Sequence, residues 1–228
     1  MTEIRLPCGP ARLYSSGPSE LAVYIPLSAE ESEAVWAALP EPRPALIALT
    51  GVDWNGALSP WPAPRAFRGG SDFAGGGADF LVRLIASIPA AEAALPCPPR
   101  CRGIAGYSLA GLFALYAAAS CDAFDCAASM SGSLWYDNFT DFLDAHPPRL
   151  RFAYLSLGDR ERRARDPRLA AVGEKTEQAA ALLRSRGIPV QFDMNPGGHF
   201  QDVPGRIARG LAALAAAAAD ASRRGLLQ

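Results

Sequence analysis

The second half of the chain alternates strand-like and helix-like runs in a regular order, and this feature constrains the fold most. The expected elements are, in order, Arg102–Gly106, Leu109–Ser120, Ala127–Ser131, Arg151–Leu157, Leu169–Ser185, Val190–Met194 and Val203–Arg224. Short apolar strands separated by helices predict a mostly parallel sheet with helices on both faces. The sequence therefore predicts the α/β fold class.

The first half predicts further elements of the same domain. Strand-like runs cover 3–6, 11–14, 21–25 and 44–50, and a helix is expected over 29–39 with Ser28 as its N-cap. A segment rich in glycine, proline and tryptophan follows over 51–77, which we expect to be a long irregular loop that is functional or mobile, and then a helix over 78–95. Because 228 residues fit one hydrophobic core, we expect a single domain over 1–228.

Composition excludes several classes of protein. A net charge of −1 argues against binding of nucleic acid or of an anionic membrane through bulk charge, and no apolar run is long enough to span a bilayer. Five cysteines without metal-ligand spacing and only two histidines predict reduced thiols and neither a metal site nor a cofactor. The first residues lack a signal-like apolar stretch, so we expect a cytoplasmic location.

The sharpest motif is Gly106-Tyr107-Ser108-Leu109-Ala110-Gly111, between a predicted strand and a predicted helix. A serine on such a turn has its hydroxyl exposed, and small residues at 106 and 110 let strand and helix approach each other. The helix start places the N–H of Leu109 where it can stabilise an oxyanion. Ser108 is thus the candidate nucleophile, and a helix-capping serine is the alternative.

A serine nucleophile needs a histidine base. His199 follows the last predicted strand and precedes the last helix, in a Pro-Gly-Gly-His-Phe run whose glycines let the loop reach back over the sheet. His146 lies in a polar connection before two prolines and is the weaker candidate. We therefore predict His199 as the base and His146 as a surface residue.

The base in turn needs an acid, which falls between serine and histidine along the chain in this architecture. Asp159 and Glu161 both follow the predicted strand 151–157 at its carboxyl end, and spacing does not separate them.

The 51–77 segment is expected to complete the site. The N–H of Val52 is the candidate for the second oxyanion donor. Its aromatic residues either line a substrate pocket or pin the loop to the core; they are Trp54, Trp61, Phe67 and Phe73. Arg65 and Arg68 are candidates for contacts with an anionic substrate.

Several motifs, taken together and in order, resemble those of the putative-esterase group of α/β-hydrolases, in particular the enterobactin-type siderophore (trilactone) esterases. They are Gly75-Gly76-Gly77-Ala78-Asp79-Phe80, the run from Gly106 to Tyr116, Ser131-Gly132-Ser133-Leu134-Trp135-Tyr136, Leu157-Gly158-Asp159-Arg160-Glu161, and Gly197-Gly198-His199-Phe200 followed by Arg206.

This resemblance implies an α/β-hydrolase fold and a serine carboxylic-ester hydrolase that needs no cofactor. In such relatives the triad acid falls three residues after the strand-ending glycine, which points to Glu161. It also implies that 131–135 lies beside the active site, with Trp135 as a substrate contact, and that the substrate is a small-molecule ester such as a siderophore trilactone. Two alternatives are an esterase of other acyl, aryl or feruloyl esters and a non-catalytic binding member of the fold.

Overall fold

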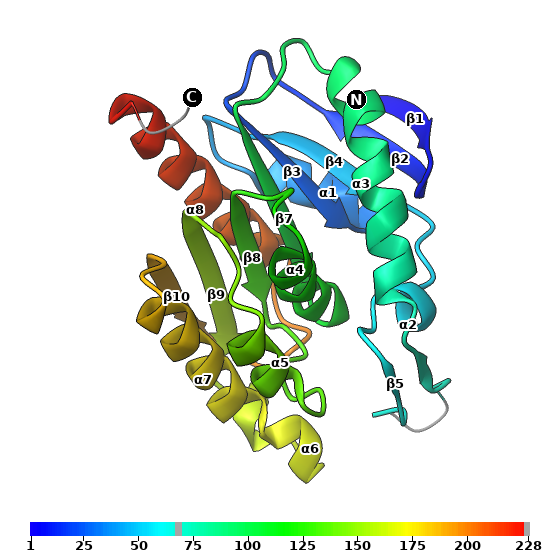
Figure 1. Ribbon diagram of the computed structural model, residues 1–228, viewed down its shortest axis with the longest axis vertical. Coiled ribbons are helices and arrows are strands. Elements are labelled where there is room, and N and C mark those ends of the chain that lie inside the picture. Colours follow the sequence, from blue (N-terminus) through cyan, green and yellow to red (C-terminus); the bar gives the residue numbers. More distant parts are fainter. Residues whose placement is uncertain (67–69, 226–228) are drawn as a thin grey trace.

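An eight-stranded, mostly parallel sheet runs through the molecule (Figure 1). The computed structural model describes residues 1–66 and 70–225. In their order across the sheet, the strands are β1 (Thr2–Leu6), β2 (Gly9–Tyr14), β4 (Ala45–Leu49), β3 (Leu21–Pro26), β7 (Cys101–Tyr107), β8 (Cys126–Met130), β9 (Phe152–Gly158) and β10 (Val190–Asn195). The pairs β1–β2 and β2–β4 are antiparallel, and the other neighbours are parallel. The predicted α/β class is confirmed.

Helices cover both faces of the sheet (Figure 1). They are α1 (Ala29–Ala38), α2 (Trp54–Ala57), α3 (Gly77–Ala93), α4 (Leu109–Ser120), α5 (Phe139–Ala145), the 3₁₀ turn η1 (Glu161–Arg163), α6 (Pro167–Ala170), α7 (Val172–Ser185) and α8 (Val203–Arg223). The apolar side chains of α1 and α8 pack together on one face, and those of α3, α4, α5 and α7 form the core of the other.

Strand β4 shows how the sequence encodes this layering. Ala45, Ile47 and Leu49 belong to the core beneath α3 and α4, whereas Leu46 and Ala48 belong to the core beneath α1 and α8. A strand buried on both faces has no polar side to alternate with its apolar side. The uninterrupted Ala-Leu-Ile-Ala-Leu run is therefore what a central strand requires.

Local signals place some of the helix boundaries. The Ser28 side chain accepts a hydrogen bond from the backbone N–H of Glu31, whose carboxylate accepts one from the N–H of Ser28 in return, and this capping box starts α1. Gly187 follows the end of α7 with φ = +79°, the left-handed conformation that glycine adopts most easily.

Two expectations about helices and loops were wrong in part. The 51–77 segment is not wholly irregular, since it contains α2 and a two-stranded ribbon of β5 (Pro62–Ala63) and β6 (Phe73–Ala74). The helix expected over 169–185 begins earlier and is divided into α6 and α7 at Ala171. It begins earlier because the Asp166 carboxylate caps the N–H of Arg168 and Pro167 occupies the first helical position, where a missing N–H costs nothing.

The sheet brings the candidate site residues to one edge. Strands β7, β8, β9 and β10 are parallel, so their carboxyl ends, at Tyr107, Met130, Gly158 and Asn195, lie along the same edge. Each strand is followed within four residues by a candidate residue or by a residue that contacts one: Ser108, Ser131, Glu161 and His199, in that order. Open α/β sheets bind their ligands at this edge. None of the helices over 1–66 and 70–225 combines the length and apolarity needed to cross a bilayer.

Candidate active site

Ser108 occupies a strained turn between β7 and α4. Its backbone has φ = 57° and ψ = −121°, a conformation that non-glycine residues rarely adopt and that clusters at functional sites. Its carbonyl accepts hydrogen bonds from the N–H of Leu112 at 3.1 Å and of Ser133 at 2.9 Å, and these bonds hold the turn. A β-carbon at Gly106 would collide with the backbone of Ala110, so the small residue predicted there has to be glycine.

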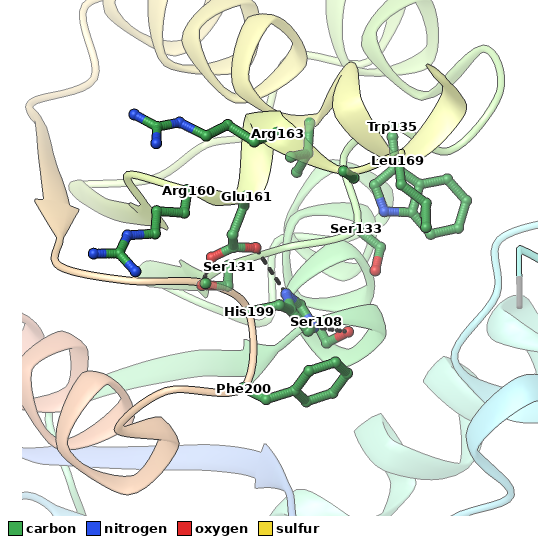
Figure 2. Close-up of a pocket in the computed structure, with 13 residues that line it drawn as sticks. Ser108, Ser131, Ser133, Trp135, Arg160, Glu161, Arg163, Leu169, His199 and Phe200 are labelled. Atoms are coloured by element: carbon green, nitrogen blue, oxygen red, sulfur yellow. Dashed lines mark hydrogen bonds and ion pairs between the residues drawn. The ribbon is translucent and has the colours of Figure 1, made fainter. Parts of the chain in front are cut away.

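His199 lies next to Ser108. Its Nε2 is 3.0 Å from Ser108 Oγ, which is hydrogen-bonding distance (Figure 2). The hydroxyl of Tyr107 donates to the His199 carbonyl at 2.5 Å, so the residue preceding the serine also fixes the histidine loop. His146, in contrast, is exposed and stacks on Phe142 with ring centroids 4.4 Å apart.

Glu161 completes the hydrogen-bonded chain from the other side of the histidine ring. Its Oε2 is 2.7 Å from His199 Nδ1. Its Oε1 accepts from the hydroxyl of Ser131 at 2.7 Å and from the N–H of Gly158 at 2.7 Å. Burial disfavours the charged form of Glu161 and would raise its pKa. The hydrogen bond and charge of His199, together with the hydrogen bonds from Ser131 and Gly158, outweigh burial, so the pKa of this carboxyl is lowered.

The structure separates the two acid candidates. Glu161 is 8% exposed and contacts the histidine ring, whereas Asp159 is exposed and its Oδ1 accepts from the N–H of Gly197 at 2.8 Å. Asp159 therefore holds the backbone of the histidine loop, and Glu161 holds the ring.

A buried arginine supports this arrangement, although the sequence indicated no role for it beyond its place in a family motif. Nη1 of Arg206, a residue of α8 that is 1% exposed, lies 3.2 Å from each of Glu161 Oε1, Ser131 Oγ and Tyr107 Oη. Its Nη2 donates to the carbonyl of Pro196 at 2.9 Å. The available signal was an arginine on the otherwise apolar buried stripe of α8, because charged residues are almost never fully buried without a partner.

Two cavities meet at Ser108. The larger has a volume of about 270 Å³ and is lined by Ser108, Ser131, Ser133, Trp135, Arg160, Glu161, Arg163, Ala164, Leu169, Val172, Gly198, His199 and Phe200 (Figure 2). The smaller, of about 140 Å³, is lined by Trp54, Asn55, Arg65, Ala66, Gly70, Ser71, Phe73, Ser108, Leu109, Ser133 and Trp135. Ser108, Ser133 and Trp135 line both, so the candidate nucleophile stands between two compartments.

The structure places the predicted substrate contacts unevenly. Trp54 and Arg65 line the smaller cavity and Trp135 lines both. Arg65 also donates to the carbonyl of Gly70 at 3.2 Å, which fastens its own loop. Arg68 and Phe67 lie outside the described residues.

The other aromatic residues of the loop divide between the two roles expected of them. Phe73 lines the smaller cavity. Trp61 instead donates to the carbonyl of Asp137 at 3.2 Å and packs edge-on against Tyr136 and Phe142, so it pins the loop.

The two predicted oxyanion donors also differ in their placement. Leu109 is the first residue of α4 and lines the smaller cavity beside Ser108. The first N–H groups of a helix have no partner within the helix and point outward. Val52 is half-buried in the turn after β4 and is not among the described residues that line either cavity at Ser108. Its donor role stays a prediction.

The fold and this edge of the sheet define an α/β-hydrolase. The chain belongs to the esterase family described as "Putative esterase", whose model matches residues 80–202, a span from α3 through the histidine loop. It is a carboxylic ester hydrolase by family.

The chain is also similar to individual proteins. The chain is 27% identical over 179 residues to the uncharacterized protein YbbA of Bacillus subtilis, with 73% of this chain and 72% of that protein covered. It superposes on siderophore hydrolase EstA from Aspergillus nidulans with a TM-score of 0.69 at 19% identity, covering 94% and 93% of the two chains. It superposes on an IroE-like serine hydrolase from Shewanella oneidensis with a TM-score of 0.72 at 14% identity, covering 91% and 75%. At these identities the two solved structures show the shared fold.

Proposed function

We propose that the chain hydrolyses carboxylic esters through a covalent acyl-enzyme on Ser108. The observation that carries this proposal is the continuous hydrogen-bonded chain from Ser108 Oγ through His199 to Glu161, with contacts of 3.0 and 2.7 Å. A serine hydroxyl is a poor nucleophile until a base accepts its proton, and the base needs a partner that fixes its tautomer.

The steps follow from this geometry. Ser108 Oγ attacks the carbonyl carbon while its proton passes to His199 Nε2, and Glu161 stabilises the imidazolium that forms. The N–H of Leu109, with a second donor that we assign to Val52, stabilises the oxyanion. The carbon–oxygen bond to the alcohol then breaks, and His199 gives the proton to the leaving alkoxide. Water repeats the sequence on the acyl-enzyme and releases the acid and free Ser108.

For the substrate we propose a siderophore ester of the catecholate trilactone type. EstA from Aspergillus nidulans, whose fold this chain shares over 94% of its length, is a siderophore hydrolase. Trp54, Trp135 and Phe73 supply aromatic surface at Ser108, and Arg65 supplies positive charge in the same cavity. Aromatic faces and a cation suit an anionic aryl group. Esters of other small acyl or feruloyl groups are the alternative.

A fluorophosphonate probe and a substrate panel test the two parts of this proposal separately. The probe should label Ser108 in the wild type, as peptide mass spectrometry shows, and Ser108→Ala should leave the protein unlabelled and inactive on p-nitrophenyl esters. A folded protein that resists the probe and hydrolyses nothing would favour a binding role. An enterobactin-type trilactone assayed in parallel decides the substrate, because turnover of aryl acetates with none of the trilactone excludes it.

A further inference from the structure

The 3₁₀ turn η1 and the residue before it comprise Arg160, Glu161, Arg162 and Arg163, whose side chains point in three directions. Glu161 points into the site, and Arg162 packs on Gly173 of α7 and pairs with Glu177 at 3.0 Å. Arg160 and Arg163 are three residues apart, and three residues make one turn of a 3₁₀ helix, so their side chains share one side. Figure 2 shows both extending from the turn in the same direction.

Arg160 and Arg163 both line the larger cavity, and both are exposed. Neither forms a side-chain hydrogen bond or ion pair with another residue over 1–66 and 70–225. Arg162 and Arg168 differ, since Arg162 pairs with Glu177 and Arg168 pairs with Asp137, each at 3.0 Å. The rim of the larger cavity thus carries two positive charges without a partner in the described chain.

The acids beside these arginines, Asp159 and Glu161, form no ion pair with them. Both oxygens of Glu161 are engaged, one by His199 and the other by Ser131, Gly158 and Arg206. Asp159 directs Oδ1 to the N–H of Gly197. The remaining lining near the arginines is largely apolar, so a ligand group of negative charge is the natural complement.

The position of the histidine decides which part of an ester occupies the larger cavity. The leaving oxygen must come within hydrogen-bonding distance of His199 Nε2, because the histidine returns the proton there. His199 lines the larger cavity, and Leu109, the proposed oxyanion donor, lines the smaller. The alcohol part therefore extends into the larger cavity, which leaves the smaller cavity for the acyl part.

We infer that the larger cavity binds the alcohol part of an ester that carries an anionic group, with Arg160 and Arg163 as specificity-determining residues. This inference rests on the proposed esterase function. Trp135, Leu169 and Phe200 contact the apolar body of the alcohol. Figure 2 shows both guanidinium groups directed away from Ser108, so the anionic group, such as a carboxylate, lies at the end of the alcohol remote from the ester bond.

A matched pair of acetate esters tests this inference: hexyl acetate and the acetate ester of ω-hydroxyhexanoate, which share a chain length and differ in a terminal carboxylate. Acid release measured in a pH-stat gives kcat/KM for each. Exposed charge pairs are worth little individually, so we expect the wild type to prefer the carboxylate ester by about three- to tenfold, mainly through KM. The preference should shrink in concentrated KCl, because salt screens exposed charges.

The arginine variants locate the effect. The double variant Arg160→Gln/Arg163→Gln should bring the ratio of the two kcat/KM values close to one, whereas Arg162→Gln, in the same turn but facing α7, should keep the wild-type ratio. Turnover of hexyl acetate with no preference for the carboxylate ester overturns the inference and leaves the esterase function standing. A preference for the carboxylate ester that survives in the double variant also overturns the inference. A preference instead for the monohexyl ester of a dicarboxylic acid, which carries its carboxylate on the acyl part, overturns it as well. Failure to hydrolyse any ester rejects the proposed function itself.

Discussion

Arg206 Nη1 lies 3.2 Å from Glu161 Oε1, and both side chains are buried. The other carboxylate oxygen of Glu161, Oε2, contacts His199. One oxygen of Glu161 thus binds a buried arginine, and the other binds the catalytic base that we propose. Because α8 supplies the arginine and η1 the glutamate, this ion pair joins the helix on one face of the sheet to the loop that carries the acid. We interpret Arg206 as a positioning residue for Glu161.

The first prediction concerns this ion pair. Arg206→Met leaves the Glu161 carboxylate buried with one fewer donor, and removal of one partner of a buried pair costs about 3–5 kcal/mol. We expect the free energy of unfolding, measured by urea denaturation, to fall by that amount and kcat to fall with it. Arg206→Lys should restore part of both.

Arg209→Met provides the control, since Arg209 lies one turn further along α8, is about half exposed, pairs with Asp202 at 3.1 Å and donates to the side chain of Asn195 at 3.2 Å. Loss of an exposed pair costs about 1 kcal/mol or less and loss of one hydrogen bond about 1 kcal/mol, so the fall in stability should stay well below that of Arg206→Met. Equal losses of stability from the two variants would contradict the positioning role of Arg206.

The second prediction separates the two acids. Glu161→Gln removes the charge that faces His199 Nδ1, and a comparable change in a serine-protease triad lowers kcat about 10⁴-fold. We expect kcat on p-nitrophenyl esters to fall by about 10²- to 10⁴-fold. Asp159→Asn should cost less than about tenfold, because an asparagine carbonyl still accepts from the N–H of Gly197. The reverse order of the two effects would make Asp159 the catalytic acid.

The third prediction concerns pH and stability. The pKa of Glu161 is lowered in the folded protein from an ordinary value of 4.5, so the folded state favours its ionised form more than the unfolded state does. Its contribution to stability is complete above pH 4.5 and is lost as the pH falls below that value. Urea denaturation of wild type and Glu161→Gln at a series of pH values should show the stability difference shrinking on acidification. A difference that grows toward low pH would mean that the folded state raises this pKa.

Much of the site follows from local sequence. Ser108 was predicted because a strand, two small flanking residues and a helix start occur at fixed spacing around it, and each is a local property. His199 followed from its place after the last strand and from the two glycines before it. Parallel strands then bring both to one edge of the sheet, whichever side chains lie between them.

Other features depend on contacts that no local pattern reveals. The choice between Asp159 and Glu161 depends on the direction in which η1 turns, and residues alone left both open until the family resemblance favoured Glu161. The network around Arg206 joins Tyr107, Ser131 and Glu161, which are between 45 and 99 residues away from it in sequence. The second oxyanion donor depends on the path of the chain after β4, where Val52 stays outside both cavities.

The last prediction uses a glycine whose small size the site requires. A β-carbon at Gly158 would collide with the carbonyl of Gly197 and would lie 2.8 Å from Glu161 Oε1 and 3.0 Å from Arg206 Nη1. Two of these contacts involve the buried acid and its ion-pair partner, and the third is rigid backbone of the histidine loop. Gly158→Ala therefore has to displace part of the site. Overpacking costs about 1–3 kcal/mol, which for a chain of this size lowers Tm by about 3–10 °C.

Gly198→Ala is the matched control, because Gly198 lies in the same loop system, has no positive φ, and a β-carbon there meets no atom within 4 Å. A glycine-to-alanine change without strain stabilises a fold slightly by restricting the unfolded chain, so Tm should stay constant or rise. Differential scanning fluorimetry of both variants, with fluorophosphonate labelling rates for Gly158→Ala, measures the two effects. We expect slower labelling of Ser108 in Gly158→Ala, since a displaced Gly197 carries His199 away from the serine; a lower Tm with an unchanged labelling rate would show that the close packing at Gly158 serves stability alone.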